Sequence, residues 1–130
     1  MTHDPTPRRT AAVRLIDGTT VTVREPAWCL GRHDQGEHLV DLTHDGPVTD
    51  LPVQTARGLV DLLDVGLTQS PYSSVPAYRE TRAAVSIAGA CYRYDAAGLF
   101  ALADAIAGHA VQLRVFAREL AVLEGREAGR

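Results

Sequence analysis

The chain has 130 residues, of which 45% are apolar and only 5% aromatic, and its formal net charge is −3. This length predicts one domain, and the few aromatic residues predict a largely aliphatic core. The acidic balance argues against a general nucleic-acid-binding protein, because such a protein normally presents a basic face.

Membrane and secretion signals are judged from apolar runs. No uninterrupted apolar run approaches the ~20 residues that cross a bilayer, so we expect no membrane partner. The first ten residues lack the apolar segment of a signal peptide. We therefore expect a cytoplasmic protein whose two cysteines, Cys29 and Cys91, are reduced.

A hairpin is predicted near the N-terminus. Residues 1–10 contain two prolines and two arginines and are expected to form a flexible tail. Residues 11–16 and 20–25 are rich in β-branched side chains, which favour strands. The Asp17-Gly18 dipeptide between them is a strong signal for a tight turn, so the two strands should pair.

Further strands are predicted downstream. Residues 48–55 alternate weakly, and residues 82–87 and 91–94 form a second predicted pair. Residues 59–67 fit either a helical turn or a strand, and residues 38–42 could form a short strand. We therefore expect an α+β fold with a small antiparallel sheet of four to six strands and one long C-terminal helix.

That helix is the clearest element and is expected over residues 96–124, with Asp95 as its N-cap. Apolar residues recur in it at heptad spacing, with His109 in the one remaining position: Leu99, Leu102, Ile106, Leu113, Phe116, Leu120 and Leu123. The apolar stripe can lie across the sheet of its own chain, or pair with a second chain to form a homodimer. The single domain would then span residues 11–124, followed by a C-terminal tail over residues 125–130.

A cluster of metal-ligand residues precedes the second half of the domain. Four of the chain's seven Cys and His residues fall within sixteen positions: Cys29, His33, His38 and His44. A thiolate and imidazoles are ligands that tetrahedral Zn²⁺ accepts, so the cluster predicts a zinc site. Cys29, His33 and His44 form the best-spaced trio, and the fourth position falls to His38, Glu25 or water.

Short motifs within and after this cluster resemble those of a known family. They comprise Pro26-x-Trp28-Cys29, His33, His44 near Gly46-Pro47, and Ser70-Pro71-Tyr72-Ser73. Together with the strands and the Ala/Leu-rich helix that follow, they resemble a family of small actinobacterial proteins, and the absence of Lys and Asn is typical of such a GC-rich source. A cysteine often stands in that family where this chain has Glu25. The resemblance therefore implies a zinc site that is weakened here unless His38 compensates, and it implies no activity.

The preferred hypothesis is a non-enzymatic binding or regulatory module. It would hold a structural Zn²⁺ through Cys29 and two or three of the histidines, form a homodimer through its C-terminal helix, and engage a protein partner. No catalytic residue is assigned. Two alternatives stay open: a small metalloenzyme with three protein ligands and Asp41 or Asp45 as base, and a metal-free interaction domain.

Overall fold

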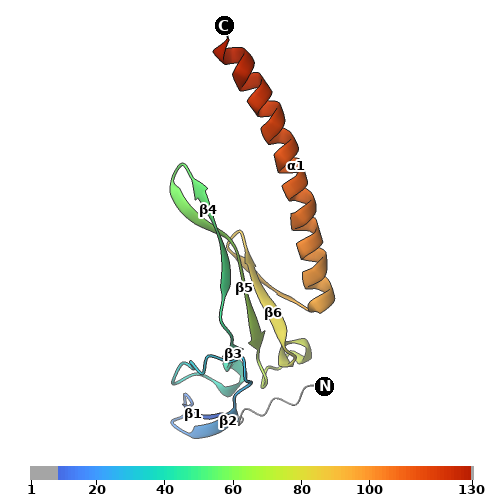
Figure 1. The fold of residues 1–130 in the computed structure, drawn as a ribbon. Helices are drawn as coiled ribbons and strands as arrows, with labels where there is room; N and C mark the ends of the chain where they lie inside the picture. The colour runs from blue at the N-terminus through green and yellow to red at the C-terminus, as the bar shows by residue number, and fades with distance from the viewer. Residues whose placement is uncertain (1–8, 130) are drawn as a thin grey trace. The chain divides into compact units, whose positions relative to one another are not determined.

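The computed structural model describes residues 9–129 (Figure 1). The chain divides into two compact units, one that ends at Asp95 and one that begins at Ala96. Most of the predicted N-terminal tail lies outside the described residues, and Thr10 already belongs to the first strand.

The first unit contains only antiparallel pairings among its strands. Its elements are β1 (Thr10–Arg14), β2 (Thr20–Arg24), β3 (His44–Asp45), β4 (Thr49–Thr55), β5 (Gly58–Gln69), β6 (Arg82–Ile87) and β7 (Ala90–Tyr94), with two 3-10 helices, η1 (Leu39–Asp41) and η2 (Pro76–Arg79). Strands β1 and β2 form a two-stranded sheet, and the other five form a second sheet in which β5 pairs with β3, β4 and β6, and β6 with β7. With the long helix that follows, this confirms the predicted α+β fold, although its strands are divided between two sheets.

The β1–β2 hairpin follows the prediction from Asp17-Gly18. Gly18 adopts a φ of +84°, and the Asp17 carboxylate accepts hydrogen bonds from the backbone N–H and the hydroxyl of Thr19. Val13 pairs with Val21 across the hairpin. Val13 and Val23 are buried and pack with Leu42, which forms the small apolar core beneath this sheet.

The structure decides one open prediction and corrects another. Residues 59–67, which fitted helix or strand equally, lie within the 12-residue strand β5. Because β5 pairs on both edges, the sheet supplies hydrogen bonds that local propensity could not reveal. The short strand expected at 38–42 is wrong: the backbone forms the 3-10 helix η1, and Leu42 turns into the core.

The second unit is the helix α1 (Ala96–Ala128), which begins where predicted and continues through four of the residues assigned to the C-terminal tail. None of its described residues is buried, and its large apolar side chains are exposed along most of its length. By length and composition alone, α1 is long and apolar enough to cross a membrane. The predicted absence of an uninterrupted apolar run of this length still holds for α1, because the test also accepts segments that contain charges. Uninterrupted runs stop at Asp104, whereas an 18-residue average tolerates one or two charges.

Candidate metal centre

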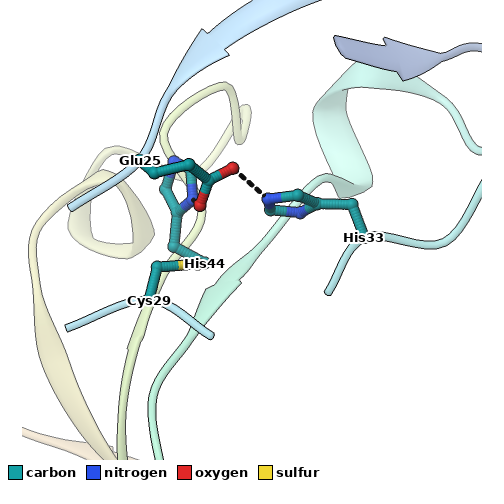
Figure 2. Close-up of side chains that lie close together, drawn as sticks. All are labelled: Glu25, Cys29, His33 and His44. Atoms are coloured by element: carbon teal, nitrogen blue, oxygen red, sulfur yellow. Dashed lines mark hydrogen bonds and ion pairs between the residues drawn. The ribbon is translucent and has the colours of Figure 1, made fainter. Parts of the chain in front are cut away.

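Four side chains with metal-binding atoms converge in the first unit: Glu25, Cys29, His33 and His44 (Figure 2). One ligand atom from each lies within 4.8 Å of the others. Glu25 directly follows β2, Cys29 and His33 lie in the loop that leads away from it, and His44 begins β3. The group therefore sits where the end of the hairpin meets the first strand of the larger sheet.

Local backbone geometry brings the loop back over β3. The Cys29 N–H donates to the Pro26 carbonyl and closes a tight turn, and the Leu30 N–H donates to the carbonyl of Asp45 on β3. Gly31 has a φ of +72°, a conformation that other residues rarely adopt. The loop is thus held against β3 by backbone hydrogen bonds.

Trp28 and Gly46 complete this contact. The Trp28 ring meets the His44 ring edge-on, with 6.5 Å between ring centroids. A Cβ at Gly46 would lie 3.2 Å from the Trp28 carbonyl oxygen and 3.4 Å from its ring, so a side chain there would push the loop away. Gly46 therefore permits the close approach that places Cys29 beside His44.

The polar atoms of the group contact one another (Figure 2). Nε2 of His33 forms a short contact with Oε1 of Glu25, and Nδ1 of His44 lies 3.3 Å from Oε2 of Glu25. The two histidine rings are edge-to-face at 5.4 Å. The side chains of Glu25, His33 and His44 are 2%, 5% and 3% exposed, so this is a buried polar cluster.

Two atoms of the cluster are left without hydrogen-bond partners. Oε2 of Glu25 and Nδ1 of His44 are buried and lie 3.3 Å apart, yet neither makes a hydrogen bond, to the other or to a further residue. A buried polar atom without a partner costs about 1–3 kcal/mol, so such atoms are rare in native proteins. Both orphaned atoms belong to the same four-residue group, which gives them a common explanation if a cation lies between them.

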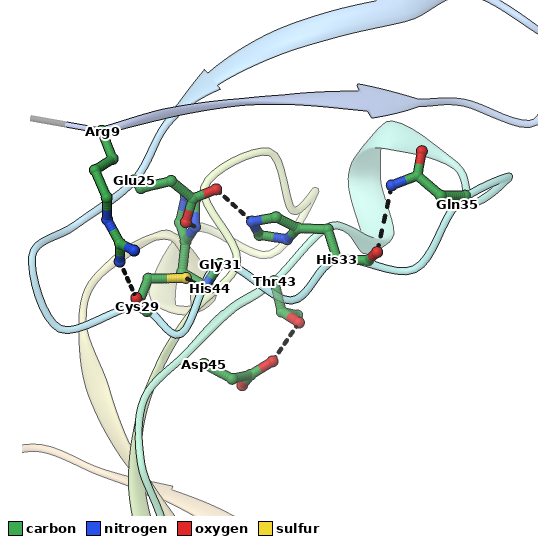
Figure 3. A network of polar contacts seen from close by, with 9 residues as sticks. All are labelled: Arg9, Glu25, Cys29, Gly31, His33, Gln35, Thr43, His44 and Asp45. Atoms are coloured by element: carbon green, nitrogen blue, oxygen red, sulfur yellow. Dashed lines mark hydrogen bonds and ion pairs between the residues drawn. The ribbon is translucent and has the colours of Figure 1, made fainter.

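The surroundings of the Cys29 sulfur favour a thiol unless a cation is bound. The Gly31 N–H donates to Sγ at 3.3 Å, and the Arg9 guanidinium donates to the Cys29 carbonyl (Figure 3). Without a cation, burial and the neighbouring Glu25 carboxylate raise the pKa of the thiol. A metal ion would reverse this balance because it stabilises the thiolate directly.

Glu25 and His44 have the protonation states that a metal site requires. Burial alone would raise the pKa of Glu25, but hydrogen bonds from Cys29 and His33 and the nearby histidines lower it overall. Burial lowers the pKa of His44, against the opposing effect of Glu25. Glu25 is therefore ionised and His44 neutral at pH 7, which are the forms that bind cations.

The separations suit a small tetrahedral ion. Zn²⁺ at its usual bond lengths to S, N and O ligands holds those atoms roughly 3.3–3.6 Å apart. The observed separations reach up to 4.8 Å, so the four side chains would have to move closer together to bind one ion. The donor set of one thiolate, two imidazoles and one carboxylate is compatible with Zn²⁺.

The structure groups Cys29, His33 and His44 from the predicted ligand set, with Glu25 as the fourth. His38 lies outside the group, on the exposed surface just before η1. Sequence reasoning named Glu25 only as one option, although it precedes Cys29 by four residues, just as Cys29 precedes His33. This regular spacing was the available signal.

The two carboxylates considered as catalytic bases have other environments. Both oxygens of Asp45 accept hydrogen bonds from hydroxyls, one from Thr43 (Figure 3) and one from Thr68, and thereby tie the loop to β5. Asp41 is exposed in η1. Neither belongs to the four-residue group.

Comparison with known proteins identifies the family. No curated protein and no solved structure matches the chain. The model of a domain of unknown function, DUF6907, matches residues 8–122, which is most of the chain. The chain therefore belongs to the DUF6907 family.

Proposed function

We propose that the domain is a non-enzymatic binding module in which Glu25, Cys29, His33 and His44 hold one structural Zn²⁺. The observation that carries this proposal is a pair of buried atoms without hydrogen bonds, Oε2 of Glu25 and Nδ1 of His44, within a four-residue ligand group. A cation at the centre of the group would bind both atoms. It would also offset the burial of the Glu25 charge.

A structural role is supported by the number of protein ligands. Structural zinc sites have four, whereas catalytic sites keep one position for water or substrate. Here four side chains converge and at least three of them are almost fully buried. The resulting site is closed and leaves no ligand position for a reacting molecule.

The position of the group indicates what the metal would stabilise. Its ligands come from the end of β2, from the loop that follows it, and from β3 in the other sheet. The apolar core at the hairpin consists of Val13, Val23 and Leu42. Metal binding would therefore fix the hairpin and its loop to the larger sheet, and its binding energy would contribute directly to folding.

Metal content tests this proposal. Protein without a His-tag, expressed with supplementary Zn²⁺, should contain about one Zn per chain by elemental mass spectrometry, with ions released only on unfolding. Cys29→Ser and His33→Ala should lose the metal, whereas the matched control His38→Ala should retain it. Metal-free wild-type protein would refute the proposal, and loss in His38→Ala would refute the ligand assignment.

We further propose a cytoplasmic homodimer that forms through α1 and presents its remaining surface to a protein partner. The exposed apolar side chains of α1 form an interaction surface, and the heptad pattern is typical of helix pairing. Both cysteines are free thiols, as expected in a reducing compartment.

Sedimentation velocity tests the dimer. Leu113 lies on the apolar stripe and Val111, two residues earlier, lies off it, yet both side chains are more than half exposed. Leu113→Asp should convert the dimer to a monomer, whereas Val111→Asp should leave it intact. A monomeric wild-type protein, or equal effects of the two substitutions, would refute pairing through this stripe.

A further inference from the structure

The apolar stripe of α1 follows heptad positions closely enough to predict which residues would flank it. With Leu99 at position a, the a and d positions are occupied by apolar residues from Leu99 to Leu123, with His109 the exception. This segment is about 36 Å long, at 1.5 Å per residue. Its a and d side chains are exposed or half-buried along the helix.

We infer that two copies of α1 pair in antiparallel orientation, with residue 99 of each helix opposite residue 123 of the other. This inference rests on the dimer proposed above and adds its geometry. The evidence lies in the charges beside the stripe, because residues at positions e and g set the orientation of paired helices.

A parallel pair would be electrostatically unfavourable. In that orientation each g residue faces the e residue five positions later in the partner, which places Glu119 opposite Glu124. Symmetry repeats this contact, so the only charged flanking pairs in a parallel dimer would be two repulsive ones. The basic residue Arg126 also occupies a g position, but it does not face either glutamate in this orientation.

An antiparallel pair removes the repulsion. Positions e then face e and positions g face g, so Glu119 lies opposite Ala105 of the partner subunit, and Gln112 lies opposite its own copy. The e positions bring Ala103 and Ala117 together, and Ala110 meets its own copy. Small residues at these contacts allow the helix backbones to approach closely, as in other tightly packed helix pairs.

The same sequence argues against a bilayer as the occupant of this surface. Asp104 and His109 lie inside the most apolar half of α1, where hydrocarbon would surround them. The stripe also continues to Leu123, beyond Arg114 and Arg118, where a membrane span would have ended. A seam between two helices buries the apolar residues and leaves both arginines in water.

Cysteine cross-linking distinguishes the orientations, in a Cys91→Ser background because Cys91 is an exposed free thiol. Gln112→Cys should form a disulfide-linked dimer on mild oxidation, because residue 112 meets its own copy only in the antiparallel pair. Leu120→Cys should not, because its two copies would be about 27 Å apart, at 1.5 Å for each of 18 residues. Gel electrophoresis without reductant gives the readout.

The outcomes separate this inference from the dimer itself. A dimer in sedimentation that is cross-linked through residue 120, or through neither residue, would overturn the antiparallel orientation and leave the dimer standing. A monomer would overturn both. Flotation of a monomeric protein with phosphatidylcholine vesicles would overturn both and assign the stripe to a membrane.

Discussion

The carboxylate of Glu25 offers the sharpest test of the metal centre, because it distinguishes this ligand set from one that uses His38. Glu25→Gln keeps the size of the side chain but removes its charge and replaces one oxygen with an NH₂ group, which cannot bind a cation. The three other ligands stay in place, so the site should be weakened rather than abolished. The informative quantity is therefore the increase in melting temperature that Zn²⁺ causes in each protein.

The size of that increase follows from linkage. At a free Zn²⁺ concentration 1,000 times the Kd, binding stabilises the wild-type fold by about 4.1 kcal/mol. For a unit of this length, 1 kcal/mol shifts the melting temperature by about 4–8 °C, so Zn²⁺ should raise it by roughly 16–32 °C. Loss of a ligand that weakens affinity about 100-fold leaves about 1.4 kcal/mol, or roughly 6–11 °C, at the same Zn²⁺ concentration.

Calorimetric melting in metal-buffered solutions measures both shifts. Each variant is compared with its own metal-free form, so that any effect of the substitution on the metal-free fold cancels. Glu37→Gln is the matched control, since Glu37 lies in the same loop region but outside the ligand group. An equal Zn²⁺-dependent shift in Glu25→Gln and wild type would show that the carboxylate is not a ligand.

Three further predictions concern the ligand group and the apolar core. Because the pKa of Cys29 is raised and His44 is neutral, Zn²⁺ binding at pH 7 should release about one proton, that of the Cys29 thiol. Titration calorimetry in buffers of different ionisation enthalpy measures this release, and Cys29→Ser should show none. In the metal-free protein the pKa values of His44 and Glu25 are lowered, so their contribution to stability should be complete above about pH 6.5 and decline as the pH falls. Urea unfolding at several pH values measures this contribution. A free energy of unfolding that does not fall on acidification would contradict the prediction. Val23→Ala should lower the free energy of unfolding by about 2–3 kcal/mol, whereas the exposed Val53→Ala should change it by less than about 0.5 kcal/mol; equal losses would place the core elsewhere.

The parts of the fold that sequence predicted well depend on short-range interactions. Asp17-Gly18 specifies its turn through a side chain that reaches only two residues, and the strands on both sides follow from it. The start of α1 at Ala96 is equally local. Strand β5 was ambiguous because its apolar residues suit both periodicities, and only pairing with β4 and β6 selects the extended form.

Prediction of the candidate site was limited in the same way, because the ligand set depends on contacts between residues far apart in the chain. Spacing alone could not choose between Glu25 and His38, because both lie close enough to Cys29 along the chain to reach it. The choice depends on η1, which turns His38 outward, and on the contact of the loop with β3, which brings Glu25 to His44. These are tertiary contacts, and the four-residue spacing of Glu25, Cys29 and His33 is a signal for a shared site but not for these contacts.

The size of the core explains why the domain would need such a site. Among the described residues, six apolar side chains are buried: Val13, Val23, Cys29, Leu42, Ala83 and Val85. Small domains with few buried side chains usually depend on a disulfide, a metal or association with another chain. Both cysteines are free thiols, so no disulfide contributes here. The buried ligand group and the exposed stripe of α1 are then the two sources of additional stability in these residues. Removing Zn²⁺ should therefore destabilise the β1–β2 hairpin more than the five-stranded sheet. Hydrogen exchange, followed strand by strand, measures this difference.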